Sequence, residues 1–296
     1  MHLSMHNWMR AEPVEVTVRR LAKYGYESLE ISGEPYIYNT KDVRKILKEN
    51  GIRCWGAVTL MLKDRNLVAK DEAQRARSVQ YTKDCVTMVK ELDGYELTIV
   101  PGTVGKIAAD GTPEEEWSWA VESMKEVYEH AMKEGVKLAV EPINRFETYF
   151  CSRGAQAIAL AKATGSECGV CLDAFHLNIE EVDPYQTIMD AKGLLVDFHV
   201  ADTNRFACGQ GHWDWLKVVG TLKTIGYDGA LTVEFVAPID RTPANPYPDA
   251  IEKNPVDISP EQKKFIEEHG SSLLTEEFYS WQVKVCADTL LPLIQG

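Results

Sequence analysis

The chain has 296 residues, of which 45% are hydrophobic and 26% are charged, enough to build a sizeable core. Its formal net charge of −13 disfavours nucleic acid and anionic membrane surfaces as partners. No apolar run approaches the ~20 residues of a membrane span, and no signal-like segment opens the sequence. The seven cysteines are an odd number scattered through apolar stretches, so we expect a reduced, cytoplasmic protein.

Short apolar strands and helices are predicted to alternate from one end of the chain to the other. We expect strands at residues 3–6, 28–32, 52–60, 97–101, 136–140, 168–172, 195–200 and 230–235. Helices are expected at residues 13–23, 41–49, 71–92, 112–133, 154–163, 184–191, 213–225 and 276–291. Eight such units predict a parallel sheet closed into a (β/α)8 barrel, a TIM barrel, that forms a single domain over residues 1–296.

A doubly wound open sheet is the alternative fold. It more often carries a glycine-rich phosphate loop after the first strand, and the sequence there is His6-Asn7-Trp8-Met9-Arg10. The barrel is therefore the preferred prediction.

Residues 237–272 interrupt the last strand–helix unit and are rich in proline. A loop of this length in a compact domain is usually a lid, a binding loop or an interface arm. We expect an irregular excursion here and no separate domain.

Cys168 and Cys171 match the C-x-x-C spacing of zinc and redox sites. They lie within or beside an expected strand, and no second pair accompanies them. We therefore interpret both as structural.

Four neighbouring strands are expected to end in an acidic or imidazole side chain: Glu141, Asp173, His199 and Glu234. Residues at the carboxyl ends of barrel strands line one mouth, so these side chains should converge. Three carboxylates and one imidazole suit Mn²⁺, Mg²⁺ or Co²⁺ better than a structural zinc site. A cation would also remove the repulsion among the carboxylates. The sequence therefore predicts a divalent metal site.

Further polar residues follow these strands on their loops. Glu147, His176 and Arg205 could hold the hydroxyls of a polyhydroxylated ligand, and a salt bridge between Glu147 and Arg205 is the alternative interpretation. Four residues are expected near the same rim, either as substrate contacts or as part of the wall: His6, Trp8, Glu30 and Trp55.

Residues 137–236 resemble the xylose-isomerase-like superfamily of sugar isomerases and epimerases, and within it the ketose 3-epimerases of the tagatose and allulose type. The resemblance rests on four motifs at similar separations. They are Glu141-x-x-Asn144-Arg145-Phe146-Glu147, Leu172-Asp173-x-Phe175-His176-x-Asn178-Ile179-Glu180-Glu181, His199-x5-Arg205, and Gly226-Tyr227-Asp228-Gly229 before Glu234.

The resemblance implies that the four strand-end residues bind Mn²⁺ or a similar cation, and that Glu141 and Glu234 also act as acid and base. It implies substrate contacts for Glu147, His176 and Arg205. A metal on a sugar carbonyl and the neighbouring hydroxyl acidifies the C–H bond between them and stabilises the enediolate. With no glycine-rich loop or basic cluster in the sequence, we expect a non-phosphorylated sugar and epimerase or isomerase activity.

A related branch offers a second enzymatic hypothesis, the catalytic subunit of a C-glycoside deglycosidase. Such a lyase removes a proton beside the ketone of a 3-oxo-C-glucoside and then eliminates the aglycone, with a small β-sandwich subunit as partner. Trp8, Trp55, Tyr149 and the proline-rich excursion could supply an apolar rim for the aglycone. Substrate identity is open between the two, because the first strand and residues 98–111 depart from the epimerase pattern.

Two other classes are weaker hypotheses. A repair barrel of the endonuclease IV type needs a basic groove and a richer metal cluster, and a non-catalytic sugar-binding protein would not need two flanking glutamates. We expect the protein to form a homo-oligomer, or a complex with a small subunit if the lyase hypothesis holds.

Overall fold

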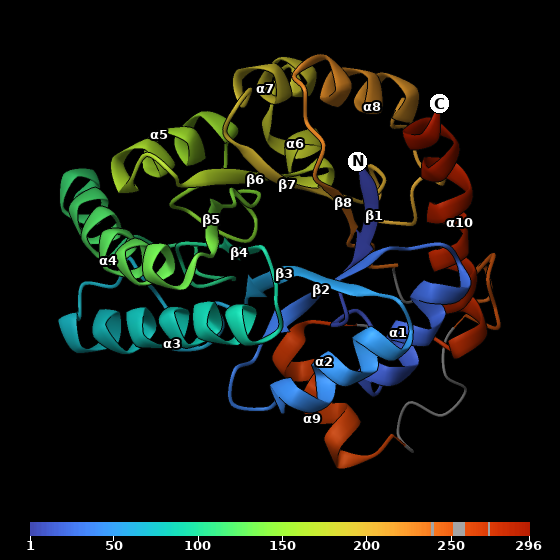
Figure 1. The fold of residues 1–296 in the computed structure, drawn as a ribbon. Helices are drawn as coiled ribbons and strands as arrows, with labels where there is room; N and C mark the ends of the chain where they lie inside the picture. Colours follow the sequence, from blue (N-terminus) through green and yellow to red (C-terminus); the bar gives the residue numbers. More distant parts are fainter. Residues whose placement is uncertain (238–239, 251–257, 272) are drawn as a thin grey trace.

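The computed structural model describes residues 1–237, 240–250, 258–271 and 273–296. Eight parallel strands form the wall of a barrel, in the order β1-β8-β7-β6-β5-β4-β3-β2, with helices around the outside (Figure 1). The predicted barrel is confirmed. The strands are β1 His2–Met5, β2 Ser28–Gly33, β3 Arg53–Thr59, β4 Glu96–Ile99, β5 Lys137–Val140, β6 Gly169–Asp173, β7 Leu195–Val200 and β8 Ala230–Val233.

The expected helices are present with small shifts at their ends. They are α1 Val14–Lys23, α2 Thr40–Glu49, α3 Glu72–Glu91, α4 Pro113–Glu134, α5 Gly154–Thr164, α7 Pro184–Asp190, α8 Trp215–Thr224 and α10 Glu276–Gln295. Local sequence fixes where they begin. At α4, for example, Thr112 and Glu115 form a capping box around Pro113 at the first helical position.

Two further helices were not predicted. The helix α6 (Ala174–Glu180) begins directly after β6, and the Asp173 carboxylate caps it by accepting a hydrogen bond from the Phe175 amide at 2.6 Å. The helix α9 (Pro260–His269) lies inside the predicted irregular excursion, so that prediction was wrong for this part. Residues 238–239, 251–257 and 272 of the excursion lie outside the described residues.

The barrel has a seam between β1 and β2. Seven neighbouring strand pairs form parallel ladders, two of them (β2 with β3 and β6 with β7) with a register shift, whereas β1 and β2 meet through one bridge, between His6 and Glu30. The Glu27 amide also donates to the Leu3 carbonyl at 3.0 Å. The bridge between His6 and Glu30 therefore lies near the carboxyl ends of the strands, at the level of the predicted site.

The core consists of apolar side chains between the strands and the surrounding helices. All seven cysteines are buried and free, including Cys168 and Cys171. No helix in the described part of the chain combines the length and the apolar character that a membrane crossing needs.

The loop after β7 is held by one buried carboxylate. Asp202 accepts hydrogen bonds from the amides of Thr203 (2.9 Å), Gly209 (2.7 Å) and Trp213 (3.1 Å), and from the Trp215 indole (3.0 Å). The Asp202 carbonyl also accepts a hydrogen bond from the Arg205 amide at 2.8 Å. Arg205 takes a φ of 60°, a left-handed conformation that costs a non-glycine residue about 1 kcal/mol. The Asp202 network thus fixes the backbone that carries Arg205.

We expect Asp202→Ala to lower the free energy of unfolding by about 4 kcal/mol, since it leaves several buried donors without an acceptor. Asp214→Ala is the matched control. Asp214 caps α8 through a single hydrogen bond to the Lys217 amide, so its loss should cost about 1 kcal/mol. Urea unfolding measures both, and equal losses in the two variants would contradict the network.

The contribution of Asp202 to the free energy of unfolding should decrease as the pH falls. Burial alone would raise the pKa of Asp202, but the hydrogen bonds from Trp215, Trp213, Thr203 and Gly209 outweigh it and lower the pKa. A lowered carboxyl pKa stabilises the folded state at neutral pH, and this contribution is lost as the pH falls through the folded-state value. The stability gap between wild type and Asp202→Ala should therefore narrow below about pH 4.

Candidate active site

The structure brings the four predicted metal ligands together. Glu141 directly follows β5, Asp173 ends β6, His199 lies in β7 and Glu234 directly follows β8. In the sheet register, Asp173 pairs with His199, which places both at the same level of the barrel. One ligand atom from each of the four side chains lies within 4.8 Å of all the others, and all four residues are buried.

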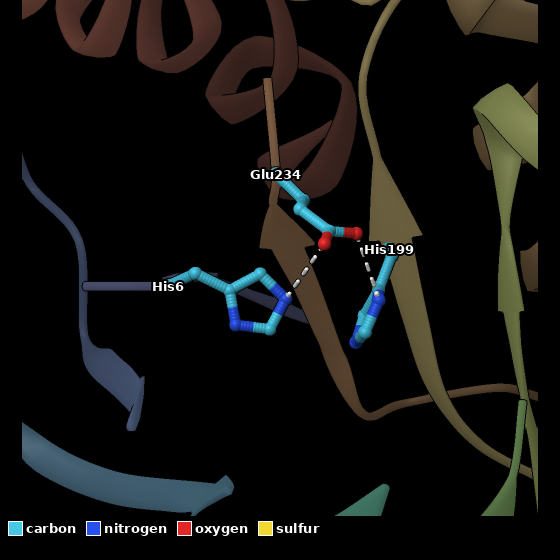
Figure 2. Close-up of side chains that lie close together, drawn as sticks. All are labelled: His6, His199 and Glu234. Atoms are coloured by element: carbon cyan, nitrogen blue, oxygen red, sulfur yellow. Dashed lines mark ion pairs between the residues drawn. The ribbon is translucent and has the colours of Figure 1, made fainter. Parts of the chain in front are cut away.

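His199 lies at the centre of this set. Its Nδ1 atom is 3.2 Å from Glu141 Oε1 and 3.3 Å from Glu234 Oε2. Figure 2 shows the Glu234 carboxylate between the imidazole rings of His199 and His6. The Nε2 atom of His6 is 3.9 Å from Glu234 Oε1. The two oxygens of Glu234 thus face different neighbours.

The same atoms lack hydrogen bonds that would satisfy them. Asp173 Oδ2, Glu234 Oε2 and His199 Nδ1 are buried, and none has a hydrogen-bond partner within the described residues. Burying such atoms without partners is costly. A divalent cation among them would satisfy all three atoms at once, and the oxygen-rich donor set matches Mn²⁺, Mg²⁺ or Co²⁺. The residues present therefore fit a metal of this class.

The electrostatics lead to the same conclusion. Burial raises the pKa of Glu141 and of Asp173, and for Asp173 the Glu234 carboxylate adds to the rise. Burial alone would lower the pKa of His199, but Cys171, Glu30 and Glu141 raise it overall. Each raised pKa means that the group binds its proton more readily when no cation is present, since a proton relieves the repulsion among the carboxylates. A bound divalent cation would take the place of those protons.

A cavity of about 350 Å³ lies above this set, within the size range of small-ligand sites. Part of its lining is polar, with Glu141, Glu147, His176, Arg205 and Glu234. A larger group of apolar side chains completes the lining, among them Trp8, Leu60, Leu62, Val104, Ile143 and Val236. The cavity thus offers both polar and apolar surface to a ligand.

Arg205 connects the predicted metal and substrate residues. Its Nη2 atom is 3.4 Å from Glu234 Oε1, and its Nη1 atom is 3.5 Å from Glu147 Oε1. The guanidinium group also lies over the Phe175 ring, 4.6 Å from its centroid. The salt bridge with Glu147 that we considered as the alternative is therefore present, and both residues also line the cavity.

Asn144 orients two of the predicted substrate residues. Its side-chain amide donates to Glu147 Oε1 at 2.7 Å, and its backbone amide donates to His176 Nδ1 at 3.2 Å. With Nδ1 accepting, the neutral His176 ring carries its proton on Nε2, which lies 3.6 Å from Asp173 Oδ2. Burial, Arg205 and His199 lower the pKa of His176, which keeps the ring neutral.

The four residues expected near the rim have different positions. Trp8 is half-buried and lines the cavity. His6 and Glu30 are fully buried inside the barrel, beside His199. The position predicted for Trp55 was wrong: it lines a separate cavity with Tyr95 and Tyr227, near the amino-terminal ends of the strands. It lies early in β3, which places it far from the carboxyl mouth.

Sequence reasoning missed other residues of the site. His269 and Gly270, at the end of α9, line the cavity, and His269 Nε2 lies 3.7 Å from Glu34 Oε1. Asp197 and Glu96 are fully buried carboxylates on β7 and β4. A signal for Asp197 was available, because a charged residue two positions before His199 in an apolar strand faces the same side of the sheet.

Known proteins share this fold and part of the sequence. A solved D-psicose 3-epimerase from Clostridium cellulolyticum H10, with D-tagatose, superposes with a TM-score of 0.83 at 20% identity and 99% coverage of both chains. The D-psicose 3-epimerase of Agrobacterium fabrum is 28% identical over 225 residues, covering 73% of this chain and 77% of that protein. The 3-dehydro-D-guloside 4-epimerase of Escherichia coli is 23% identical over 228 residues, covering 73% of this chain and 84% of that protein.

A family model matches most of the chain, which is enough to assign the family. Residues 18–256, which include all four strand-end ligands and the polar part of the cavity lining described above, match the model of one protein family. The chain belongs to the xylose isomerase-like TIM barrel family.

Proposed function

We propose that the protein is a divalent-metal-dependent sugar epimerase that removes a proton beside the carbonyl group of a non-phosphorylated ketose. One observation carries the proposal. Glu141 and Glu234 line the cavity from opposite ends of the β5–β8 segment, whereas His199 and Asp173 complete the same set and are almost fully buried. The two glutamates can therefore face the metal and the substrate together.

Epimerisation needs two acid/base groups, because a proton leaves one face of a carbon and another returns to the opposite face. Glu141 and Glu234 come from strands separated by β6 and β7, so their carboxylates approach a ligand from two directions. Arg205 holds Glu234 through the contact between Nη2 and Oε1. The cation held by Glu141, Asp173, His199 and Glu234 would supply Lewis-acid stabilisation of the developing negative charge.

The polar residues that line the cavity can form hydrogen bonds with the hydroxyl groups of a sugar. His176 can donate through Nε2, Glu147 accepts, and Arg205 donates. We propose these three residues, with Trp8 against the ring and His6 behind Glu234, as the substrate-binding set. A phosphate group fits poorly, because three glutamates line this cavity and Arg205 is the only Arg or Lys among its described lining residues.

The relatives support this choice. The D-psicose 3-epimerase of Agrobacterium fabrum matches most of the chain, and the D-psicose 3-epimerase with D-tagatose has the same fold. Their names place a free ketose in a barrel of this kind. Mn²⁺ is our preferred cation, with Mg²⁺ and Co²⁺ as the alternatives, since all accept an oxygen-rich set.

A second candidate is the lyase that cleaves 3-oxo-C-glucosides. Two observations favour it: apolar side chains outnumber polar ones in the cavity lining, which suits an aromatic aglycone, and one relative is a 3-dehydro-D-guloside 4-epimerase, an enzyme named for a keto-glycoside. In this reaction a glutamate takes the proton from the carbon beside the ketone. The bond from the anomeric carbon to the aglycone then breaks, a double bond forms in the sugar, and the aglycone takes up a proton.

The proposed cellular location is supported by the state of the cysteines. All seven cysteines are free and buried, which supports the proposed cytoplasmic location. A homo-oligomer, or a complex with a small subunit in the lyase case, stays a prediction. So does the organisation of residues 1–296 as one domain, which the single barrel supports.

The first prediction is that a divalent cation stabilises the protein. At 100 times its dissociation constant, Mn²⁺ should add about 2.7 kcal/mol and raise the melting temperature by about 4 °C. EDTA should reverse the shift. Asp173→Asn should lose most of it, while Asp228→Asn, which changes an exposed aspartate on the β8 side of the barrel, should retain it. Calorimetry measures all three proteins, and a full shift in Asp173→Asn would contradict the ligand assignment.

The second prediction concerns the chemistry. With Mn²⁺ in D2O, wild-type protein should incorporate deuterium at C3 of a free ketohexose, detected by NMR. Glu234→Gln should reduce exchange at least about 100-fold, because a carboxamide cannot accept the proton. Glu126→Gln, at an exposed glutamate paired with Lys83, should exchange as wild type does.

The same assay separates the two candidates. Release of aglycone from a 3-oxo-C-glucoside without exchange into free ketoses would select the lyase. Absence of both reactions with Mn²⁺-loaded protein would contradict the proposed function.

A further inference from the structure

His199 contacts acidic groups through both of its ring nitrogens. The contacts of Nδ1 with Glu141 and Glu234 belong to the set described above. Its Nε2 atom faces the barrel interior instead, 3.1 Å from Glu30 Oε2 and 3.4 Å from Asp197 Oδ2. Glu30 and Asp197 are fully buried, and neither lines the cavity.

The two interior carboxylates differ in how they are held. Asp197 accepts from the Thr232 hydroxyl at 2.9 and 3.1 Å and from the Phe198 amide at 2.8 Å, so existing bonds fix its position. Neither carboxylate oxygen of Glu30 has a well-aligned hydrogen bond within the described residues. The oxygen that faces His199, Oε2, is also 3.1 Å from His6 Nδ1. Glu30 therefore has free acceptor capacity beside His199.

A histidine that binds a metal is neutral and uses one nitrogen for the metal, so its proton is on the other. A buried N–H needs an acceptor, and metal-bound histidines usually donate this proton to a carboxylate or a carbonyl group. For His199 the metal set faces Nδ1, which leaves Nε2 for the proton. Glu30 Oε2 is the nearer of the two carboxylate oxygens that can accept it.

We propose that Glu30 is a positioning residue that accepts the Nε2 proton of His199, fixes the ring in one tautomer and presents Nδ1 to the metal, with Asp197 as the supporting acceptor. The inference rests on the proposed metal-dependent function. Glu30 acts only through His199, because it does not line the cavity. Its position on the seam also joins His199 to His6 on the opposite strand.

Glu116 provides a matched control for this role. It is a buried glutamate on α4, away from the barrel interior, and its Oε1 atom accepts from the Asp110 amide at 2.7 Å and from the Tyr149 hydroxyl at 2.8 Å. It is absent from the groups of residues that could share a cation with His199. Glu30→Gln and Glu116→Gln are therefore equally conservative changes at buried glutamates, and only the first alters the acceptor of His199.

The experiment measures Mn²⁺ binding to purified protein by electron paramagnetic resonance, without any substrate. Glu30→Gln should weaken Mn²⁺ binding about 10- to 100-fold, the range found for acceptors of metal-bound histidines. Glu116→Gln should stay within about threefold of wild type. Wild-type affinity in Glu30→Gln, or equal losses in the two variants, would overturn the inference.

A second measurement needs no substitution at Glu30. In wild-type protein with ¹⁵N-labelled histidine and Mg²⁺, NMR should show the His199 proton on Nε2, with the signal identified by its loss in His199→Asn. A proton on Nδ1 would overturn the inference. If wild-type protein binds no divalent cation, the proposed function fails. In metal-free protein, at a pH high enough to make the His199 ring neutral, the same NMR measurement then decides the Glu30 inference separately, with the proton on Nε2 supporting it and on Nδ1 overturning it.

Discussion

An excess of buried negative charge at one mouth of the barrel is the constraint on which the site depends. Glu141, Asp173 and Glu234 converge on a single imidazole, and the interior adds further carboxylates below it. Arg205 is the one guanidinium in direct contact with this set, among the residues that the structure describes. Its charge is too small to balance so many acids in a low-dielectric interior. The proposed divalent cation would supply the positive charge that Arg205 cannot.

The strands that carry these acidic residues could be predicted from the sequence because barrel strands follow a simple rule. An apolar run buried on both faces, followed by a charged residue, marks a strand that ends at the functional mouth. Asp173 and His199 fit that rule, and the register of β6 and β7 places them side by side. The rule needs no knowledge of tertiary contacts, which is why the convergence of these four side chains was predictable from the sequence.

Other features depend on contacts that sequence patterns do not encode. The helix α6 is short and begins at Asp173, whose capping role was hidden by its expected role as a ligand. The helix α9 lies in a proline-rich stretch, where Ser259 and Pro260 start a helix that the composition argues against. Trp55 was misplaced for a different reason: β3 begins at Arg53, within one residue of the predicted start, so the early position of Trp55 in the strand already pointed away from the carboxyl mouth. The roles of the interior carboxylates depend on packing across the barrel.

The seam between β1 and β2 has a consequence for slow motions of the fold. Few backbone hydrogen bonds join these strands, so the amide hydrogens of β2 that face β1 should exchange with solvent through local opening, whereas those that face β3 lie in a ladder. Glu30 bridges the seam through His6 and contacts His199 across the barrel. An opening that displaces Glu30 would remove the proposed acceptor of His199, so metal binding at the proposed site would disfavour local opening of the seam. Deuterium uptake by the amides of β2 that face β1 would then fall when the metal binds.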